Sequence, residues 1–397
     1  MTLISPKNEA ELVEAVSKAV DNKSPLSIIG NGSRSGLGRA VQNAQTLTTS
    51  NLTGIILLEP AEMIFSARAG TPVSVVVDAL AKHNQMMTFE PMDHRKLYGT
   101  DAEPTIGAVA AGNISGPRRI SAGAARDSLI GVRMVNGRAQ MIKNGGRVMK
   151  NVTGLDLVKL VSGSWGTLGV LSEVTFKVLP KAEKSATLVL SGLDDATAVE
   201  ALCQAMTSQF EATGTAHMPA GVGDANAQTF IRLEGFEKQL SYRFDRMRQH
   251  LSAFGKAEEM TGDDSEALWR DIRDVVPLAE PADRAIWKIS VAPTKGAQFV
   301  QRFREKQDFD AMYDWSGGLI WIALDPATNG DAGANALRAI VKELGGHATL
   351  IRGSQELRAR IDVFQPLSAP LAKITRGIKT SFDPDGIFNS GLMYPGV

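Results

Sequence analysis

Cysteine is nearly absent from this sequence. Cys203 is the single cysteine among 397 residues, which excludes an internal disulfide, a cysteine-ligated iron–sulfur cluster and a cysteine-rich zinc site. Only five histidines are present, so a multi-histidine metal site is not expected. No run of about 18 apolar residues occurs, and no membrane-spanning helix is expected. Net charge is also absent, because 43 Lys and Arg balance 43 Asp and Glu. This balance gives no reason to expect a nucleic-acid-binding protein.

The first residues lack the basic and apolar runs of a secretory signal. We therefore expect a cytoplasmic protein. Glycine, in contrast, is abundant at 38 residues, and glycine-rich segments concentrate before residue 180. After that point strands alternate with longer helices. We predict domains at 1–180 and 181–365, followed by a C-terminal segment at 366–397.

Hydrophobic periodicity predicts an α+β fold. The Asn136-Gly137 pair predicts a tight hairpin between strands at 129–135 and 138–142, because both residues tolerate positive φ. A final amphipathic helix carries Leu367, Leu371, Ile374 and Ile378 on one face. The other predicted strands are 26–29, 55–58, 63–69, 170–179, 186–190, 229–233, 285–291, 319–324 and 347–351, and the helices of the second domain are 196–210, 238–254 and 332–344.

A glycine-rich loop at 30–36 follows the first of these strands. Its glycines would let backbone N–H groups approach a diphosphate. The Rossmann fingerprint is not met, since Ser35 occupies the third glycine position and no acidic residue ends a second strand. Taken alone, the loop favours an ordinary connection between strands over a ligand site. Three further small-residue loops are predicted before residue 180, at 105–116, 123–127 and 163–169, and together with the first loop they favour a phosphate-containing ligand.

Positive charge gathers between residues 105 and 160. Nine basic residues there are opposed only by Asp127 and Asp156, an excess of seven. The segment is either a solvated basic face or a positive environment for a diphosphate or an acidic partner. Nucleic acid is disfavoured because no aromatic residues are interleaved to stack bases. Since one or two arginines suffice for a diphosphate, we expect Arg118 and Arg119 to face an acidic surface on another subunit.

Several motifs resemble the FAD-binding fold of the vanillyl-alcohol-oxidase (PCMH) type. They are the loop at 30–36, Thr105-Ile106-Gly107…Gly112-Asn113, the segments 126–131, 145–156 and 163–170, and Phe388-Asn389. Within that family the chain is similar to the FAD-binding subunits of glycolate oxidase (glycolate dehydrogenase). The motifs Gly116-Pro117-Arg118-Arg119 and Val148-Met149-Lys150-Asn151 carry that closer similarity.

The resemblance implies a PCMH-type FAD-binding domain of two α+β subdomains at 1–180 and a ferredoxin-like α+β cap for substrate or partner at 181–365. It further implies that the segment 366–397 returns to the flavin. FAD is expected to be bound non-covalently, because the first loop offers no histidine. The implied FAD-binding residues are Gly30, Asn31, Gly32, Ser33, Arg34, Ser35, Gly36, Pro91, Thr105, Ile106, Gly107, Ala110, Gly112, Asn113, Ser115, Gly123, Arg126, Asp127, Gly169, Val170 and Asn389.

By the same resemblance, the chain is a subunit that contributes to oxidation of glycolate, a small 2-hydroxy acid, to glyoxylate. Its partners would be a sister FAD-containing catalytic subunit and an iron–sulfur subunit that passes electrons to a quinone-type acceptor. A stand-alone FAD-dependent 2-hydroxy-acid dehydrogenase and a non-catalytic flavin-bound scaffold are the alternatives. His94 is the candidate for a catalytic base. The second-domain histidines His217, His250 and His347 are widely separated, so they are expected to be structural, and no metal site is predicted.

Overall fold

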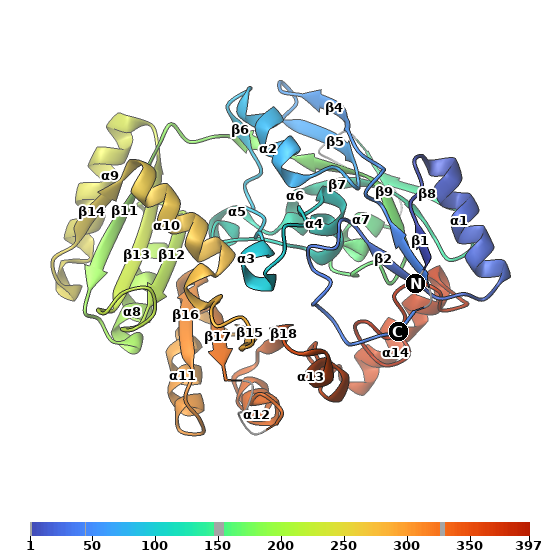
Figure 1. Cartoon of the computed structure of the whole chain (residues 1–397). Coiled ribbons are helices and arrows are strands. Elements are labelled where there is room, and N and C mark those ends of the chain that lie inside the picture. Colours follow the sequence, from blue (N-terminus) through green and yellow to red (C-terminus); the bar gives the residue numbers. More distant parts are fainter. Residues whose placement is uncertain (1, 44, 147–154, 326–329) are drawn as a thin grey trace.

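The computed structural model describes residues 2–43, 45–146, 155–325 and 330–397. Figure 1 shows two α+β lobes, with the N-terminal lobe in blue and teal and the second lobe in green to orange. Part of the motif at 145–156, including Val148-Met149-Lys150-Asn151, lies outside the described residues.

A small parallel sheet opens the N-terminal lobe, with strand order β1-β3-β2. Helix α1 covers it and buries Leu12 and Val16 against it. The Asn8 side chain caps this helix by accepting from the Glu11 N–H at 2.9 Å. These elements are β1 (Thr2–Ile4), α1 (Glu9–Asp21), β2 (Leu26–Ile29) and β3 (Gln45–Thr48).

A five-stranded antiparallel sheet, in the order β4-β5-β9-β7-β8, forms the second part of this lobe. Phe65, Phe89 and Phe176 stack in its core. Its strands are β4 (Ile55–Glu59), β5 (Ile64–Arg68), β7 (Leu129–Val135), β8 (Met141–Gly145) and β9 (Val170–Lys177), and β6 (Gln85–Met86) pairs with β10 (Leu179–Pro180) beside it. The helices are α2 (Val73–Ala81), α3 (Arg95–Tyr98), α4 (Ile106–Gly112), α5 (Arg119–Ala122), α6 (Ala125–Ser128) and α7 (Leu157–Val161).

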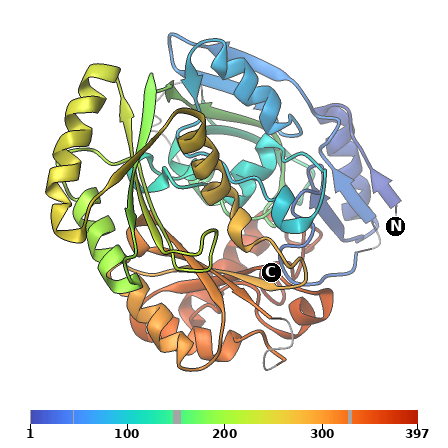
Figure 2. The same cartoon turned by 60° about the vertical axis from the view of Figure 1, so that its left-hand side comes forward.

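The second lobe is built from two βαββαβ units that share one eight-stranded antiparallel sheet. The first unit contributes β11-α8-β12-β13-α9-β14 and the second β15-α11-β16-β17-α12-β18. Counted from the outer edge of the sheet towards its centre, the strands of each unit follow the order fourth, first, third, second: β14-β11-β13-β12 in the first unit and β18-β15-β17-β16 in the second. This order is ferredoxin-like. The two units meet where β12 pairs with β16. Figure 2 shows helices of both units on one face of the sheet. The predicted ferredoxin-like α+β arrangement is therefore found, in two copies.

The elements of this lobe are β11 (Lys184–Ser191), α8 (Asp195–Met206), β12 (Gly214–Met218), β13 (Gln228–Gly235), α9 (Glu237–His250), β14 (Glu258–Thr261), α10 (Gly262–Asp274), β15 (Ala285–Ser290), α11 (Gly296–Arg304), β16 (Asp310–Asp314), β17 (Leu319–Leu324), α12 (Ala334–Leu344) and β18 (His347–Arg352). Four 3₁₀ turns connect them: η1 (Ser252–Phe254), η2 (Val276–Leu278), η3 (Pro293–Lys295) and η4 (Trp315–Gly317). Sequence periodicity missed β12, β14, β16, α10 and α11.

Helix α13 (Gln355–Arg360) follows β18, and the C-terminal segment contains α14 (Ala369–Phe382) and then returns to the small parallel sheet. Phe388 forms a parallel bridge with Leu26 of β2. The buried Lys379 ammonium donates to the Thr167 carbonyl at 2.8 Å, to Asp383 Oδ2 at 2.6 Å and to the Phe388 carbonyl at 2.7 Å. These bonds fix the returning segment against the N-terminal lobe.

Two sequence predictions of local structure were wrong. The hairpin after β7 has positive φ at Ala139 rather than at Asn136 or Gly137, so its turn is longer than the tight type, and β8 starts at Met141. Gly137 is needed for another reason: a Cβ there would lie 2.6 Å from the Asp383 Cα. The small-residue segment at 106–112 was interpreted as a loop but is helix α4, capped by the Thr105 side chain.

No helix in the described part of the chain is long and apolar enough to cross a membrane.

Candidate cofactor-binding site

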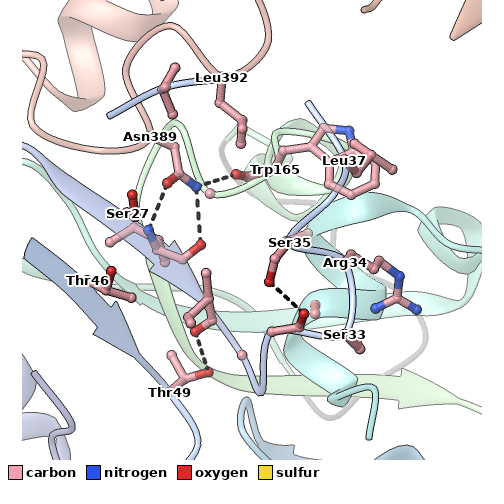
Figure 3. A pocket seen from close by; sticks show the side chains of 18 of the residues that line it. Ser27, Ser33, Arg34, Ser35, Leu37, Thr46, Thr49, Trp165, Asn389 and Leu392 are labelled. Carbon is pink, nitrogen blue, oxygen red and sulfur yellow. Dashed lines mark hydrogen bonds between the residues drawn. The ribbon is translucent and has the colours of Figure 1, made fainter. Parts of the chain in front are cut away.

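A cavity of about 420 Å³ lies in the N-terminal lobe where β2 ends. Figure 3 shows it with side chains from β2, the loop that follows, the segment around Trp165 and the C-terminal segment. Its glycine-rich loop residues are Gly30, Asn31, Gly32, Ser33, Arg34 and Ser35, and predicted residues Gly107, Gly169 and Asn389 also line it.

The backbone of this loop is open to a ligand. Ser35 and Leu37 close turns by donating to the Gly32 and Arg34 carbonyls. Over the described residues, the four N–H groups of residues 31–34 donate to no protein acceptor. Buried or half-buried amides are normally paired, and a cluster of free N–H groups on one turn is an anion-binding arrangement. The loop therefore presents donors suited to a diphosphate.

Glycine at position 32 is required by its conformation. Its φ is +84°, a region that β-branched residues avoid. Gly30 is constrained by space instead, because a Cβ there would lie 2.3 Å from Thr105 Oγ1. Thr105 is thus placed behind the loop, as the cap of α4, and does not line the cavity.

Arg34 enters the cavity wall as a half-buried cation whose Nη1 is buried. Its Nε–H donates to Nδ1 of His94 at 3.2 Å, and Nη2 donates to the Met92 carbonyl at 3.2 Å. Nη1 has no hydrogen-bond partner in the part of the chain that the structure describes. Burial lowers the pKa of Arg34 to about 10, so the group stays charged. An unpaired, buried N–H of a cation is a donor that an anionic ligand would complete.

His94 is neutral in this setting. Burial, with the charges of Arg34 and Lys288, lowers its pKa well below 6.5. Because Nδ1 accepts from Arg34, the ring proton lies on Nε2 and the basic nitrogen is engaged. The imidazole also stacks on Tyr98, whose hydroxyl donates to the Ile351 carbonyl of the second lobe. This geometry suits His94 to orienting Arg34 and not to removing a substrate proton.

Asn389 lies at the opposite wall, where its side chain joins three segments. Its Oδ1 accepts from the Ile28 N–H at 2.7 Å, and its Nδ2 donates to the Trp165 carbonyl at 2.8 Å. Figure 3 shows both bonds. Asn389 therefore fixes the cavity wall, and few of its side-chain hydrogen-bonding positions are left for a ligand.

The other predicted residues lie outside the cavity lining, and their cofactor roles stay predictions. Several organise the neighbouring turns: Asn113 Oδ1 accepts from the Arg126 N–H, Ser115 Oγ from the Ala125 N–H, and Asp127 Oδ2 from the Ala124 N–H. The remaining members are Gly36, Pro91, Thr105, Ile106, Ala110, Gly112, Gly123 and Val170.

Sequence reasoning missed part of the lining. Trp165 and Gly166 lie within the recognised glycine motif, which was the available signal. Gln355 and Arg358 come from α13, assigned to the second domain, and no sequence pattern marked them. Arg358 Nη1 donates to the Gly38 carbonyl at 3.1 Å, which ties this helix to the glycine-rich loop.

The second-domain histidines do not converge. His217 is buried and pairs with Thr229 at 2.9 Å, His250 packs against Phe210, and His347 opens β18. Across the ranges that the structure describes, no three His, Cys, Asp or Glu side chains gather as metal ligands.

One prediction about the basic segment was wrong, as the contacts between the two lobes (the seam) show. Arg118 is buried and pairs with Glu90 at 3.0 Å and with Glu234. Arg232 donates to both Glu90 oxygens at 2.9 Å. Arg118 therefore joins the two lobes of this chain and cannot face another subunit. Arg133, which pairs with Glu9, is likewise engaged within the chain.

Comparison with known proteins gives three findings. The family described as "FAD binding domain" matches residues 2–145. The chain is 33% identical over 383 residues to the glycolate oxidase subunit GlcE of Escherichia coli (strain K12), covering 96% of each protein. It is 26% identical over 188 residues to the glycolate oxidase subunit GlcD of Bacillus subtilis (strain 168), covering 47% of this chain and 38% of that protein.

Among solved structures, p-cresol methylhydroxylase with substrate bound superposes with a TM-score of 0.77 at 13% identity, over 98% of this chain and 88% of that one. This likeness concerns the fold.

Proposed function

The chain belongs to the family of the glycolate oxidase subunit GlcE, an FAD-binding family of oxidoreductases, and we propose that the cavity at residues 30–35 holds the FAD. The observation that carries the proposal is the set of unpaired backbone N–H groups at 31–34 in the cavity wall. Four amides and one unpaired guanidinium nitrogen supply donors for a diphosphate without a second cation.

The residues fit this cofactor in three ways. The amides of the loop would hold the pyrophosphate, with Arg34 Nη1 as a charged donor beside them. Small residues of α4, Gly107, Ala108 and Ala111, would let a flat ring system approach the backbone closely. Asn389 would keep the strand end and the Trp165 segment at a fixed separation. No histidine or cysteine lies in the loop, so the FAD is held non-covalently in this proposal.

Bound FAD supplies a two-electron acceptor for oxidation of a 2-hydroxy acid. We propose that the chain serves glycolate oxidation, in which two electrons and two protons leave glycolate to give glyoxylate. A sister FAD-containing subunit and an iron–sulfur subunit would complete the path to a quinone-type acceptor. Cys203, the single cysteine, lies on α8 with Sγ 3.5 Å from the Ser316 carbonyl. This chain cannot ligate a cluster by itself, and in this proposal any contact with the membrane is made by its partners.

The flavin itself gives the first test. The purified chain is expected to be yellow, with a flavin absorbance spectrum and about one FAD per chain. Precipitation with acid should leave all of the flavin in the supernatant. A folded, colourless protein that binds no FAD when FAD is added would refute the assignment of the cavity. Flavin that stays with the precipitated protein would refute non-covalent binding.

Glycolate reduction of the flavin gives the second test. Flavin bleaching by anaerobic glycolate would be followed for the chain alone and after addition of the partner subunits. Reduction only in the reconstituted complex supports the subunit role. Rapid turnover of the chain alone with an artificial acceptor supports a stand-alone dehydrogenase, and no reduction in either case supports a scaffold.

A further inference from the structure

Two basic side chains meet at the seam between the lobes without an acidic partner. The guanidinium carbon of Arg119, on α5, lies 4.3 Å from the ring centroid of Trp315. The Lys288 Nζ, on β15, lies 5.2 Å from the same ring and 5.6 Å from Trp321. Within the described ranges, neither side chain makes a hydrogen bond or an ion pair. Two positive charges from different lobes therefore share one indole.

Acidic groups elsewhere in the seam are already engaged. Glu90 and Glu234 are bound to Arg118 and Arg232. The remaining buried carboxyl, Asp314, accepts from the Trp315 N–H at 2.7 Å. Burial raises the pKa of Asp314 to about 7, so it is a poor counter-ion for a neighbouring cation at neutral pH.

The ammonium of Lys288 is consequently short of acceptors. Burial, aided by the charge of Arg119, lowers its pKa to about 8, and the group is still charged at neutral pH. An ammonium carries three N–H donors and no acceptor. Cation–π contacts offset only part of the desolvation of a buried charge. A hydrogen-bonding anion would supply what the protein does not.

Backbone conformation holds the shared indole in place. Trp315 and Ser316 have φ of 50° and 58°, in the left-handed region that non-glycine residues rarely occupy. The Trp315 Nε1–H donates to the Gly116 carbonyl at 3.1 Å, and the Ser316 N–H donates to Thr215 Oγ1 at 2.9 Å. Strain of this kind persists where the surroundings fix it, and such positions cluster at ligand sites.

We propose that Lys288 and Arg119 bind the carboxylate of a small hydroxy acid at the seam of the two lobes. The inference rests on the proposed function for the choice of a carboxylate. Accessibility favours it: Arg119 is exposed and Lys288 half-buried, so a small anion can reach them from solvent. The charge of Lys288 also contributes to the lowered pKa of His94, whose Nδ1 accepts from Arg34 in the cavity wall.

The experiment uses the FAD-containing chain and measures binding without turnover. Glycolate, or oxalate as a carboxylate that is not a 2-hydroxy acid, is titrated while tryptophan fluorescence is recorded, and isothermal calorimetry gives the Kd. Inorganic phosphate is titrated in parallel. The variants are Lys288→Met and Lys288→Arg, with Lys295→Met as control because Lys295 is an exposed lysine just beyond β15.

Wild type is expected to bind both carboxylates saturably and more tightly than phosphate. Lys288→Met should weaken carboxylate binding at least tenfold, Lys288→Arg should restore most of it, and Lys295→Met should match wild type. Because Lys288→Met removes a half-buried charge that has no ion-pair partner among the described residues, its urea midpoint should equal or exceed that of wild type. A lower midpoint would show a structural role.

Three results would overturn the inference: no saturable carboxylate binding, unchanged binding in Lys288→Met, or phosphate bound as tightly as glycolate. FAD absorbance in each sample separates this inference from the proposed function. A yellow protein that ignores carboxylates refutes only the carboxylate site. A protein that cannot bind FAD refutes the cofactor assignment whatever the titration shows.

Discussion

The ion-pair network at Glu90 gives a prediction whose size follows from its geometry. Glu90 accepts from the Arg118 N–H at 2.9 Å, from Arg118 Nη2 at 3.0 Å, and from both Arg232 Nη atoms at 2.9 Å. Replacement by Gln removes the charge and keeps the shape. Breaking a buried pair from one side costs roughly 3–5 kcal/mol. Glu234 remains beside both arginines, so we expect the lower end, a loss of about 3 kcal/mol in unfolding free energy.

The pKa of Glu90 predicts how this contribution to stability depends on pH. The two arginines outweigh the effect of burial and lower the pKa of Glu90 from its ordinary 4.5 to about 2. Between these values the unfolded chain binds more protons than the folded one, so stability rises with pH across that window. The depression corresponds to about 3 kcal/mol that is complete above pH 4.5 and disappears as the pH falls towards 2. The two routes therefore agree.

The assay is urea unfolding of wild type, Glu90→Gln and Glu62→Gln from pH 7 to pH 3. Glu62 is an exposed glutamate of the same lobe and serves as the matched control. Glu90→Gln should lose about 3 kcal/mol at pH 7 and show a shallower decline in acid, while Glu62→Gln should follow wild type. A loss below about 1 kcal/mol, or an unchanged acid slope, would show that the network does not join the lobes as argued.

Two further predictions concern the cofactor loop and the C-terminal segment. Gly32→Val should abolish FAD binding while the chain stays folded, measured as flavin absorbance per chain, because positive φ strains a β-branched residue by about 1–3 kcal/mol; Gly192→Val, with a similar φ of +77° away from the cavity, should keep its FAD. Lys379→Met leaves the buried Asp383 unpaired and should lower stability by about 3–5 kcal/mol and reduce FAD content, whereas exposed Lys373→Met should change neither in the same measurements.

Strands and loops with a strong local signal were predicted from the sequence. β7 and β17 have the predicted bounds. β17 is a continuous apolar run followed by Asp325, and β7 is a mostly apolar run that ends at the turn beginning with Asn136. β12 was missed because all five of its residues are buried and its composition, with glycine and histidine, gives no alternation. Helix α4 was missed because two glycines suggested a loop. Gly107 is there for packing: its Cβ would lie 2.6 Å from the Ala69 Cβ.

The glycine-rich loop could be identified because a diphosphate-binding turn is made by consecutive residues. The charge of the segment at 105–160 could not be interpreted in the same way. Arg118 is neutralised by Glu234, 116 residues further along the chain, and Arg133 by Glu9, 124 residues before it. Counting charges along the sequence cannot reveal such pairs. Two of the nine basic residues of this segment, Arg118 and Arg133, are therefore paired with acidic residues that lie far away in the sequence.

The seam between the lobes contains both ion-paired side chains and basic side chains without an acidic partner among the described residues. Glu90 and its partners are mutually satisfied, so they contribute stability and have no capacity left for a ligand. Exposed Arg119 and half-buried Lys288 have no acidic partner among the described residues, and both lie on Trp315, whose backbone is strained and whose indole N–H is hydrogen-bonded. A half-buried cation without a counter-ion, such as Lys288, destabilises the folded protein, and binding of an anionic ligand would explain why it is retained. The ion pairs of Glu90 thus fix the two lobes in the arrangement that brings Arg119 and Lys288 to the same tryptophan, where both can bind one anion.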